Sequence, residues 1–442
     1  MMANTPAERI QLLETRVEDA RAQNNVDTLI AGLFELGQAY LDTGDTPKAL
    51  TQFEEGIQFC HKSGDELSEA RFWGFKGICL VRLGNAHFAQ IAFYKSLKMA
   101  RALDYKSLIV DALTQIGSLL LDTDQPEKAI SKYEQALAEA LNTGEQRRVM
   151  LIASKIGGIF LGLESLEKAM DYYAMALQTA QALGDRRAEC VYHINIGNVL
   201  FANHEMEAAN DHFEQALNLA MDLEDAQVEI SALSNLLRTS IAADKSSMAL
   251  LYGESVIRQA AAVHEPAIEI ANIHALTSYL MDKGQYRKAQ PYLERGLVLA
   301  EGQQDWDWQL TVLLNLGNTA YQLERLPQAA DYYRQGLVVA GKALNNLVEA
   351  QLLGRLSAVQ ADMGELETAV LTARKALDLA QQLENPVLIG EQQMLLSFTH
   401  SELTQTEEAI AYAQAATQTY RASGQDALAE QAAAFAASLS EQ

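Results

Sequence analysis

Small and hydrophobic residues recur along this chain with a fixed period of forty residues. Stepping forty residues at a time from Ala49 to Ala409 reaches ten positions, and all ten are alanine. Four residues after the alanine an aromatic residue stands in six repeats, and small and aliphatic residues dominate seven and eight after it. Offsets of four, seven and eight lie on one face of an α-helix, so this pattern predicts one amphipathic helix in every repeat.

A second set of positions predicts a second helix in each repeat. The residue twelve before each alanine is glycine in six repeats and Leu, Thr or Ser in the others: Gly37, Gly77, Gly117, Gly157, Gly197, Leu237, Thr277, Gly317, Ser357 and Ser397. In the first repeat we expect helix A over Thr28–Leu41 and helix B over Pro47–His61. We refer to the two sets as the glycine column and the alanine column. Both are expected where helix A and helix B cross, because larger side chains there would push the helix axes apart.

Turn and capping residues stand between these predicted helices. Four glycines fall in the short connection from helix A to helix B, where a left-handed backbone is often needed: Gly44, Gly84, Gly284 and Gly364. Three aspartates follow a helix B and are suited to cap the next helix A: Asp65, Asp185 and Asp225.

These patterns together predict an all-α, right-handed solenoid of about ten helix-turn-helix repeats over residues 28–426. Residues 1–27 are expected to form an N-terminal capping helix, with helical spacing over Pro6–Asn24, and residues 427–442 a C-terminal one over Ala427–Leu439. The sixth and seventh repeats depart most from the pattern. Either a bend near residues 237–277 or gradual drift within a continuous superhelix accounts for that departure.

The order of small and aromatic positions on a pair of helices resembles the tetratricopeptide repeat. The consensus tryptophan, leucine-glycine, tyrosine, alanine and aromatic positions are matched by Trp73, Leu36-Gly37, Tyr40, Ala49 and Phe53. The forty-residue period is similar to that of kinesin light chains, the Leu-Gly-Asn polarity adaptors and bacterial regulator arms. The resemblance implies a protein-interaction scaffold that holds an extended peptide along an inner groove lined by the helices A.

Composition narrows the classes of partner. The 442 residues include 34 basic and 58 acidic side chains, for a formal net charge of −24, which disfavours nucleic acid and anionic membranes. No apolar stretch approaches 18 residues and the beginning of the chain lacks a signal-peptide pattern, so neither membrane insertion nor secretion is expected. Three scattered cysteines, Cys60, Cys79 and Cys190, are expected as free thiols of a cytoplasmic protein, and Cys79 and Cys190 are expected to be buried.

Motifs of catalysis or metal binding are missing from the sequence. It contains no phosphate-binding glycine loop, no GxSxG, no HExxH and no CxxC. His204 and His212 are eight residues apart, but the predicted turn separates them, so surface histidines are expected there rather than a zinc site. We therefore expect no enzyme activity, no metal and no cofactor.

Polar side chains on the inner side of the helices A are the candidate binding site. Positions two before and one after the glycine column are expected to face the groove, and in the middle repeats they are Lys155, Asn195, Asn198, Asn235, Arg238, Asn315, Asn318 and Arg355. Amides can pair with the backbone of an extended peptide, and the cations can select carboxylates, so an acidic peptide is the expected partner. Alternatively, these asparagines bond within the scaffold.

Three functions remain open from the sequence. The preferred one is the interaction scaffold. The others are a regulatory subunit of a separately encoded effector (a protease, kinase or transcription factor) and a structural protein that self-assembles into homo-oligomers. Trp306 and Trp308 form a further candidate contact between two repeats, with one ring expected to staple the next helix A and the other to be exposed.

Overall fold

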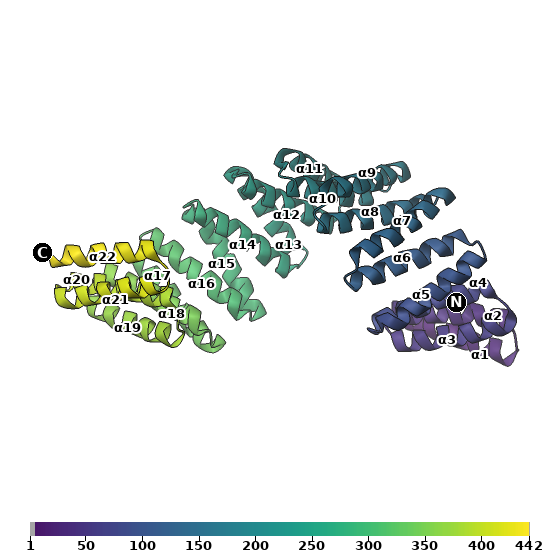
Figure 1. Ribbon diagram of the computed structural model, residues 1–442, viewed down its shortest axis with the longest axis horizontal. Coiled ribbons are helices and arrows are strands. Elements are labelled where there is room, and N and C mark those ends of the chain that lie inside the picture. The colour runs from purple at the N-terminus through teal and green to yellow at the C-terminus, as the bar shows by residue number, and fades with distance from the viewer. Residues whose placement is uncertain (1–4, 442) are drawn as a thin grey trace. The chain divides into compact units, whose positions relative to one another are not determined.

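The structure, a computed structural model, describes residues 5–441, and in this part of the chain all regular elements are helices, 22 in number (Figure 1). The first is α1 (Pro6–Ala22) and the last is α22 (Asp426–Ser440). The helices A are α2 (Val26–Asp42), α4 (Glu66–Arg82), α6 (Lys106–Asp122), α8 (Gln146–Gly162), α10 (Arg186–Ala202), α12 (Ala226–Ala242), α14 (Pro266–Asp282), α16 (Trp306–Gln322), α18 (Asn346–Asp362) and α20 (Pro386–Glu402). The helices B are α3 (Thr46–Ser63), α5 (Ala86–Ala102), α7 (Pro126–Thr143), α9 (Leu166–Leu183), α11 (Met206–Asp222), α13 (Ser246–Ala262), α15 (Tyr286–Gln303), α17 (Leu326–Ala343), α19 (Leu366–Gln382) and α21 (Thr406–Ala422).

Ten helix pairs between two further helices confirm the predicted helical repeat solenoid. The predicted bounds of the first pair, Thr28–Leu41 and Pro47–His61, fall inside α2 and α3 and miss two residues or fewer at each end. Every residue of the alanine column is fully buried. The column therefore lies at helix contacts, as the sequence pattern predicts.

The glycine column makes room for the aromatic side chain four residues after the alanine. A Cβ placed on Gly37 would lie 2.4 Å from the Phe53 ring, and one on Gly317 would lie 2.2 Å from the Tyr333 ring. In the last two repeats serine replaces glycine and alanine replaces the aromatic residue. There Ser357 Oγ donates to the carbonyl oxygen of Ala369 at 2.7 Å, a residue of the alanine column. Both combinations, glycine with an aromatic ring and serine with alanine, thus stand at the same buried contact between two helices.

The predicted turns and caps are confirmed. Gly44, Gly84, Gly284 and Gly364 have φ between +68° and +84°. The carboxylates of Asp65, Asp185 and Asp225 accept hydrogen bonds from backbone N–H groups in the first turn of the following helix A. The helices A mostly begin with such an Asp or Asn cap, whereas α3 alone among the helices B does so within the described residues. Side-chain caps therefore fix mainly where the helices A begin.

The chain divides into two compact units, residues 1–232 and 233–442, and the division falls inside α12. In the N-terminal unit, α4 contacts both α2 and α6, and in the C-terminal unit, α18 contacts both α16 and α20. Helices A of successive repeats thus lie side by side and form one face of each unit. No helix among residues 5–441 is long and apolar enough to cross a membrane.

Candidate functional site

The candidate site residues lie on the face that the helices A form in each unit. On α16, Leu316 and Gly317 are buried, whereas Asn315 and Asn318 on either side of them are half-buried and reach the surface. This alternation follows from the helical period, because two residues of each turn enter the helix pair and the next ones point away from it. The predicted positions therefore present polar groups beside the packed core.

Three of the predicted residues belong to the N-terminal unit. Lys155 on α8 is exposed, and its Nζ lies 6.0 Å from the centre of the Tyr133 ring. With Tyr133 and Gly158 it lines an open pocket of about 430 Å³. Lys155 forms no ion pair with any residue between 5 and 441. Asn195 and Asn198 are half-buried and lie about one turn apart on α10.

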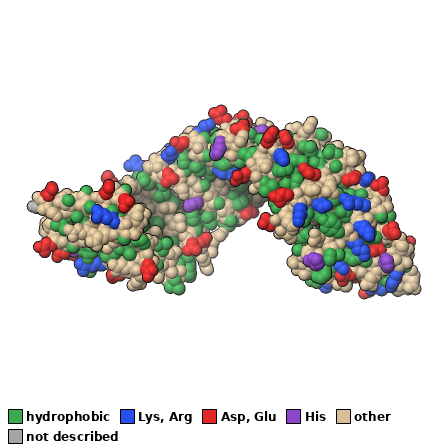
Figure 2. All heavy atoms as spheres, viewed as in Figure 1, with side chains coloured by type: hydrophobic (Ala, Val, Ile, Leu, Met, Phe, Trp, Pro, Cys, Tyr) green, Lys and Arg blue, Asp and Glu red, His purple; other side chains and the backbone are tan. Residues whose placement is uncertain are grey.

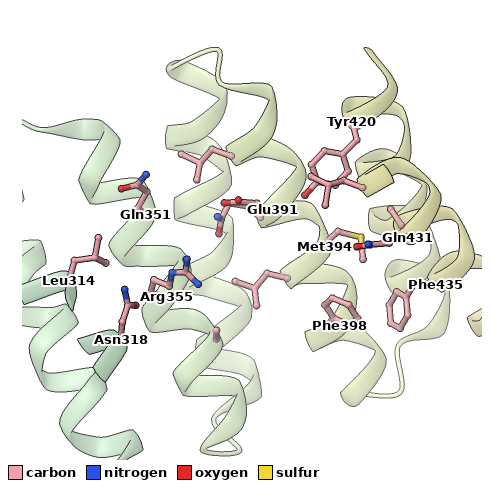
Figure 3. A pocket seen from close by; sticks show the side chains of 17 residues that line it. Leu314, Asn318, Gln351, Arg355, Glu391, Met394, Phe398, Tyr420, Gln431 and Phe435 are labelled. Carbon is pink, nitrogen blue, oxygen red and sulfur yellow. The ribbon is translucent and has the colours of Figure 1, made fainter. Parts of the chain in front are cut away.

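The other five residues belong to the C-terminal unit, where the structure brings two of them together. Asn235 and Arg238 lie on α12 and Asn315 lies on α16, and these three do not line the pockets that hold the other two. Asn318 on α16 and Arg355 on α18 line two adjoining pockets of about 620 and 350 Å³. In Figure 3 both side chains stand at the open centre of the larger pocket, between Leu314 on one side and Phe398 on the other.

The larger pocket combines a polar end with an apolar end. Gln351 lies four residues before Arg355 on α18, and Glu391 lies on α20. At the apolar end the rings of Phe398 and Phe435 approach to 4.4 Å between centroids (Figure 3). A pocket of this size with a few polar groups and apolar walls is typical of ligand-binding sites.

One buried amide in the larger pocket lacks a hydrogen-bond partner. Gln392 is only 4% exposed, and its Oε1 accepts no hydrogen bond from the described residues. The side chain fits against Gly354, where an added Cβ would lie 2.7 Å from Gln392 Oε1. An unpartnered buried oxygen is costly, and a donor entering the pocket would remove that cost.

The smaller pocket shows how the scaffold holds Asn318. Tyr333 Oη donates to Asn318 Oδ1 at 2.8 Å, and burial raises the pKa of Tyr333, which keeps the phenol protonated as a donor. The amide oxygen of Asn318 is therefore used within the repeat, and its amide nitrogen donates no hydrogen bond to a described residue.

Arg355 stands at the wall between the two pockets without a carboxylate of its own. It forms no ion pair within residues 5–441, although the chain carries 58 acidic side chains. The nearby Asp362 instead accepts a hydrogen bond from Tyr321 Oη at 2.7 Å, and that bond raises the pKa of Tyr321. The guanidinium is exposed and free to bind an anion.

Family models decide the class of repeat. Tetratricopeptide repeat models match residues 269–340 and residues 112–147. The chain is a tetratricopeptide repeat protein.

Solved structures similar to this tetratricopeptide repeat protein share little sequence with it. BtubC from P. vanneervenii is 17% identical, with a TM-score of 0.47 and coverage of 50% of this chain and 94% of that one. The apo form of RapI is 13% identical, with a TM-score of 0.47 and coverage of 75% and 98%. The C-terminal part of a repeat-containing protein from Cytophaga hutchinsonii is 15% identical, with a TM-score of 0.46 and coverage of 60% and 95%. Among curated proteins, no sequence matches the chain significantly.

Several side chains of the larger pocket were not among the sequence-predicted residues. Gln351 and Glu391 stand six residues before the glycine column, on the same face of helix A as Arg355. This row lies outside the two positions that were expected to face the groove. Gln392 stands in a column that holds Val312 and Leu352 in the preceding repeats, so a polar residue in an apolar column is the signal that could have found it.

Of the two histidines that were predicted to lie on the surface, one does not. His204 is exposed as expected, but His212 is half-buried and its Nδ1 lies 2.9 Å from Nδ1 of the buried His193. Burial, and then the charge of His212, lower the pKa of His193 to about 4. The expectation of a surface histidine at position 212 is therefore wrong, because helix packing pairs it with a residue nineteen positions earlier.

The two tryptophans and the three cysteines lie as expected. Trp306 is the first residue of α16 and is 45% exposed, whereas Trp308 is half-buried with its ring edge against His274. The three cysteines are buried free thiols. In residues 5–441, no three His, Cys, Asp or Glu side chains are grouped to hold a metal ion.

Proposed function

We propose that this tetratricopeptide repeat protein is a non-catalytic interaction scaffold that holds an extended acidic segment of a partner protein against the helices A. The observation that carries the proposal is Arg355, an exposed guanidinium without an ion pair among residues 5–441, at the junction of two pockets. Arginine binds a carboxylate through two parallel hydrogen bonds, so an aspartate or glutamate side chain fits this position.

The residues around Arg355 indicate further chemical features of the bound segment. The amide nitrogen of Asn318 is oriented by Tyr333 and is suited to donate to a backbone carbonyl of the segment. Phe398, Leu395 and Phe435 offer a cavity for one large apolar side chain next to the carboxylate. A backbone N–H or polar donor at that side chain would satisfy Gln392 Oε1. The bound segment therefore contains an acidic residue next to a bulky apolar residue.

The remaining predicted residues extend this proposal along each unit. In the C-terminal unit Asn235, Arg238 and Asn315 would add backbone and carboxylate contacts. In the N-terminal unit Lys155 would take a second carboxylate, and Asn195 and Asn198 would contact the backbone. Each such contact would add about 0.5–1.5 kcal/mol to the binding free energy.

A selection from random peptides tests the proposal while the partner is unidentified. Random dodecapeptides displayed on phage are panned against the full chain, against Arg355→Glu and against Arg374→Glu. Arg374 is the matched control, because it is an exposed arginine of α19 that forms no ion pair with described residues and lies outside the pockets. We expect the wild type and Arg374→Glu to enrich peptides with Asp or Glu beside a bulky apolar residue, and Arg355→Glu to lose them. Absence of acidic enrichment, or equal loss in both variants, would contradict the proposal.

A further inference from the structure

One stretch of the N-terminal unit has a charge opposite to that of the whole chain. Residues 70–103 contain no aspartate or glutamate, and they contain six basic residues: Arg71, Lys76, Arg82, Lys95, Lys98 and Arg101. The rest of the chain carries 28 basic and all 58 acidic residues, a formal charge of −30. Lys76 is paired with Glu54 at 2.7 Å, whereas the other five basic residues of the stretch are exposed. Charges more than about 8 Å away are largely screened at physiological salt, so these exposed cations favour an anionic partner nearby.

The helix at the end of this stretch also exposes large apolar side chains. On α5, Phe88 is 61% exposed, Ile91 is 50% exposed and Tyr94 is 40% exposed. They are three residues apart and so lie along one face of the helix. Exposed apolar residues scattered singly are ordinary, but three in successive turns form a patch. Figure 2 shows hydrophobic and basic side chains side by side in the region of α5.

Basic side chains continue the same face toward the end of α5. Lys98 is exposed and forms no ion pair with any residue from 5 to 441. Lys95 Nζ lies 3.9 Å from the buried Glu69 and 4.0 Å from the centre of the Trp73 ring, and Arg101 Nη2 donates to Gln135 Oε1 at 3.5 Å. From the neighbouring helix B, Lys132 Nζ lies 5.9 Å from the centre of the Tyr94 ring. We call the outward face from Phe88 to Arg101 the α5 face.

We propose that the α5 face is a docking surface for an acidic amphipathic helix of a partner protein. The face spans thirteen residue steps of α5, or about 20 Å, which matches a partner helix of about four turns. Its apolar half buries the hydrophobic stripe of such a helix, and its basic half takes the carboxylates. This surface lies on a helix B and is separate from the pockets around Arg355.

The charges also fix the direction of the partner helix. Acidic residues are most stable in the first turn of a helix, where they complement its dipole. The basic half of the α5 face lies at the C-terminal end of α5, and its lysine and arginine attract those same acidic residues. The partner helix therefore runs antiparallel to α5, with its acidic N-terminal turns over Lys98 and Arg101 and its apolar turns over Phe88 and Ile91.

An acidic helical peptide matches the α5 face better than a membrane surface does. A peptide of four turns is short enough to contact the α5 face, whose own exposed charges, Lys95, Lys98 and Arg101, are positive. An anionic bilayer is extended, and the chain as a whole carries a net charge of −24, which the bilayer repels.

The test uses a designed probe and a matched pair of variants of the full chain. The probe is a fluorescein-labelled helical peptide of about 17 residues, with glutamates in its first two turns and leucines at i, i+3 and i+4 in its last two. The second peptide has glutamine in place of glutamate. Ile91→Glu is compared with Leu371→Glu, because Leu371 stands at the same position of its repeat, two residues after the alanine column, and is 62% exposed.

We expect fluorescence anisotropy to show binding of the acidic probe at low salt, weakened several-fold by about 0.5 M salt. Ile91→Glu and Lys98→Glu should each lower the affinity about tenfold or more, whereas Leu371→Glu should leave it unchanged. The glutamine peptide should bind more weakly than the acidic probe. No binding of the probe, or equal effects of Ile91→Glu and Leu371→Glu, would overturn the proposal.

Two alternative occupants are separate outcomes of the same experiment. Vesicles of phosphatidylcholine with phosphatidylserine should not bind the chain in flotation, and vesicle binding that Ile91→Glu removes would overturn the assignment to a protein helix. Light scattering should show the same mass for wild type and Ile91→Glu. A dimer in the wild type alone would mean that a second copy of this chain covers the face, which would also overturn the assignment.

Discussion

Replacing single glycines by alanine tests the helix packing, because the space available for an added Cβ differs from one glycine to the next. Gly197→Ala adds a Cβ that would lie 2.5 Å from the Phe213 ring, about 1 Å closer than ordinary contact. Gly157→Ala adds one at 3.0 Å from the Tyr173 ring, which a shift of a few tenths of an ångström relieves. At Gly341, near the end of α17, an added Cβ has no neighbour within 4 Å.

The magnitudes follow from two opposing effects. Overpacking a core costs about 1–3 kcal/mol, and replacing glycine by alanine inside a helix stabilises it by about 0.5–1 kcal/mol. Gly197→Ala should therefore lower the free energy of unfolding by about 1–2 kcal/mol. Gly157→Ala should be close to neutral, and Gly341→Ala should stabilise by about 0.5 kcal/mol.

The assay is urea unfolding followed by circular dichroism, with hydrogen exchange of the mutated helix pair as a local readout. A local readout is needed because repeat proteins unfold in sections that contact only their neighbours. If the three variants have equal stability, or if Gly197→Ala is the most stable, the glycine column does not make room for the aromatic rings and the packing argument fails.

Two further predictions concern the histidine pair His193–His212 and the side-chain cap of α10. His193 has its pKa lowered to about 4 from 6.5, so between these pH values the unfolded chain binds a proton that the folded chain does not. Stability should therefore fall as the pH drops from about 6.5 to about 4, by up to about 3 kcal/mol, and His193→Gln should lack most of that loss in acid titrations of unfolding. Asp185→Ala should cost about 1 kcal/mol by removing the cap of α10, measured by urea unfolding, whereas Ser165→Ala should be nearly neutral because Ser165 makes no capping bond.

Most of the fold could be predicted because it depends on the spacing of residues that are close together in the sequence. A period of forty with ten alanines specifies ten helix pairs, and each contact involves residues close in sequence. Exchanges between columns, such as Ser357 with Ala373 in place of glycine with an aromatic residue, keep both positions buried. Because the helices follow from this local spacing, their bounds in the first repeat were predicted to within two residues.

The site could be predicted only in part, because a pocket depends on the angles between successive helices. The period identified the face that carries Asn318 and Arg355, but not that these two share a pocket with Glu391 of the next repeat and Phe435 of α22. The pairing of His193 with His212 likewise depends on how α10 crosses α11. Spacing along one helix contains no information on either contact.

Exchanging the charges of Arg355 and of the ligand's acidic residue tests whether the guanidinium holds the partner's carboxylate. A peptide enriched on the full chain is synthesised in two forms, with its acidic residue kept or replaced by lysine, and its affinity is measured by calorimetry for wild type and for Arg355→Glu. We expect Arg355→Glu to weaken binding of the acidic form by about tenfold to a hundredfold, and the lysine form to regain most of this loss on the variant. If Arg355→Glu binds both forms as the wild type does, the guanidinium between the two pockets does not hold the partner's carboxylate, and the binding surface lies elsewhere.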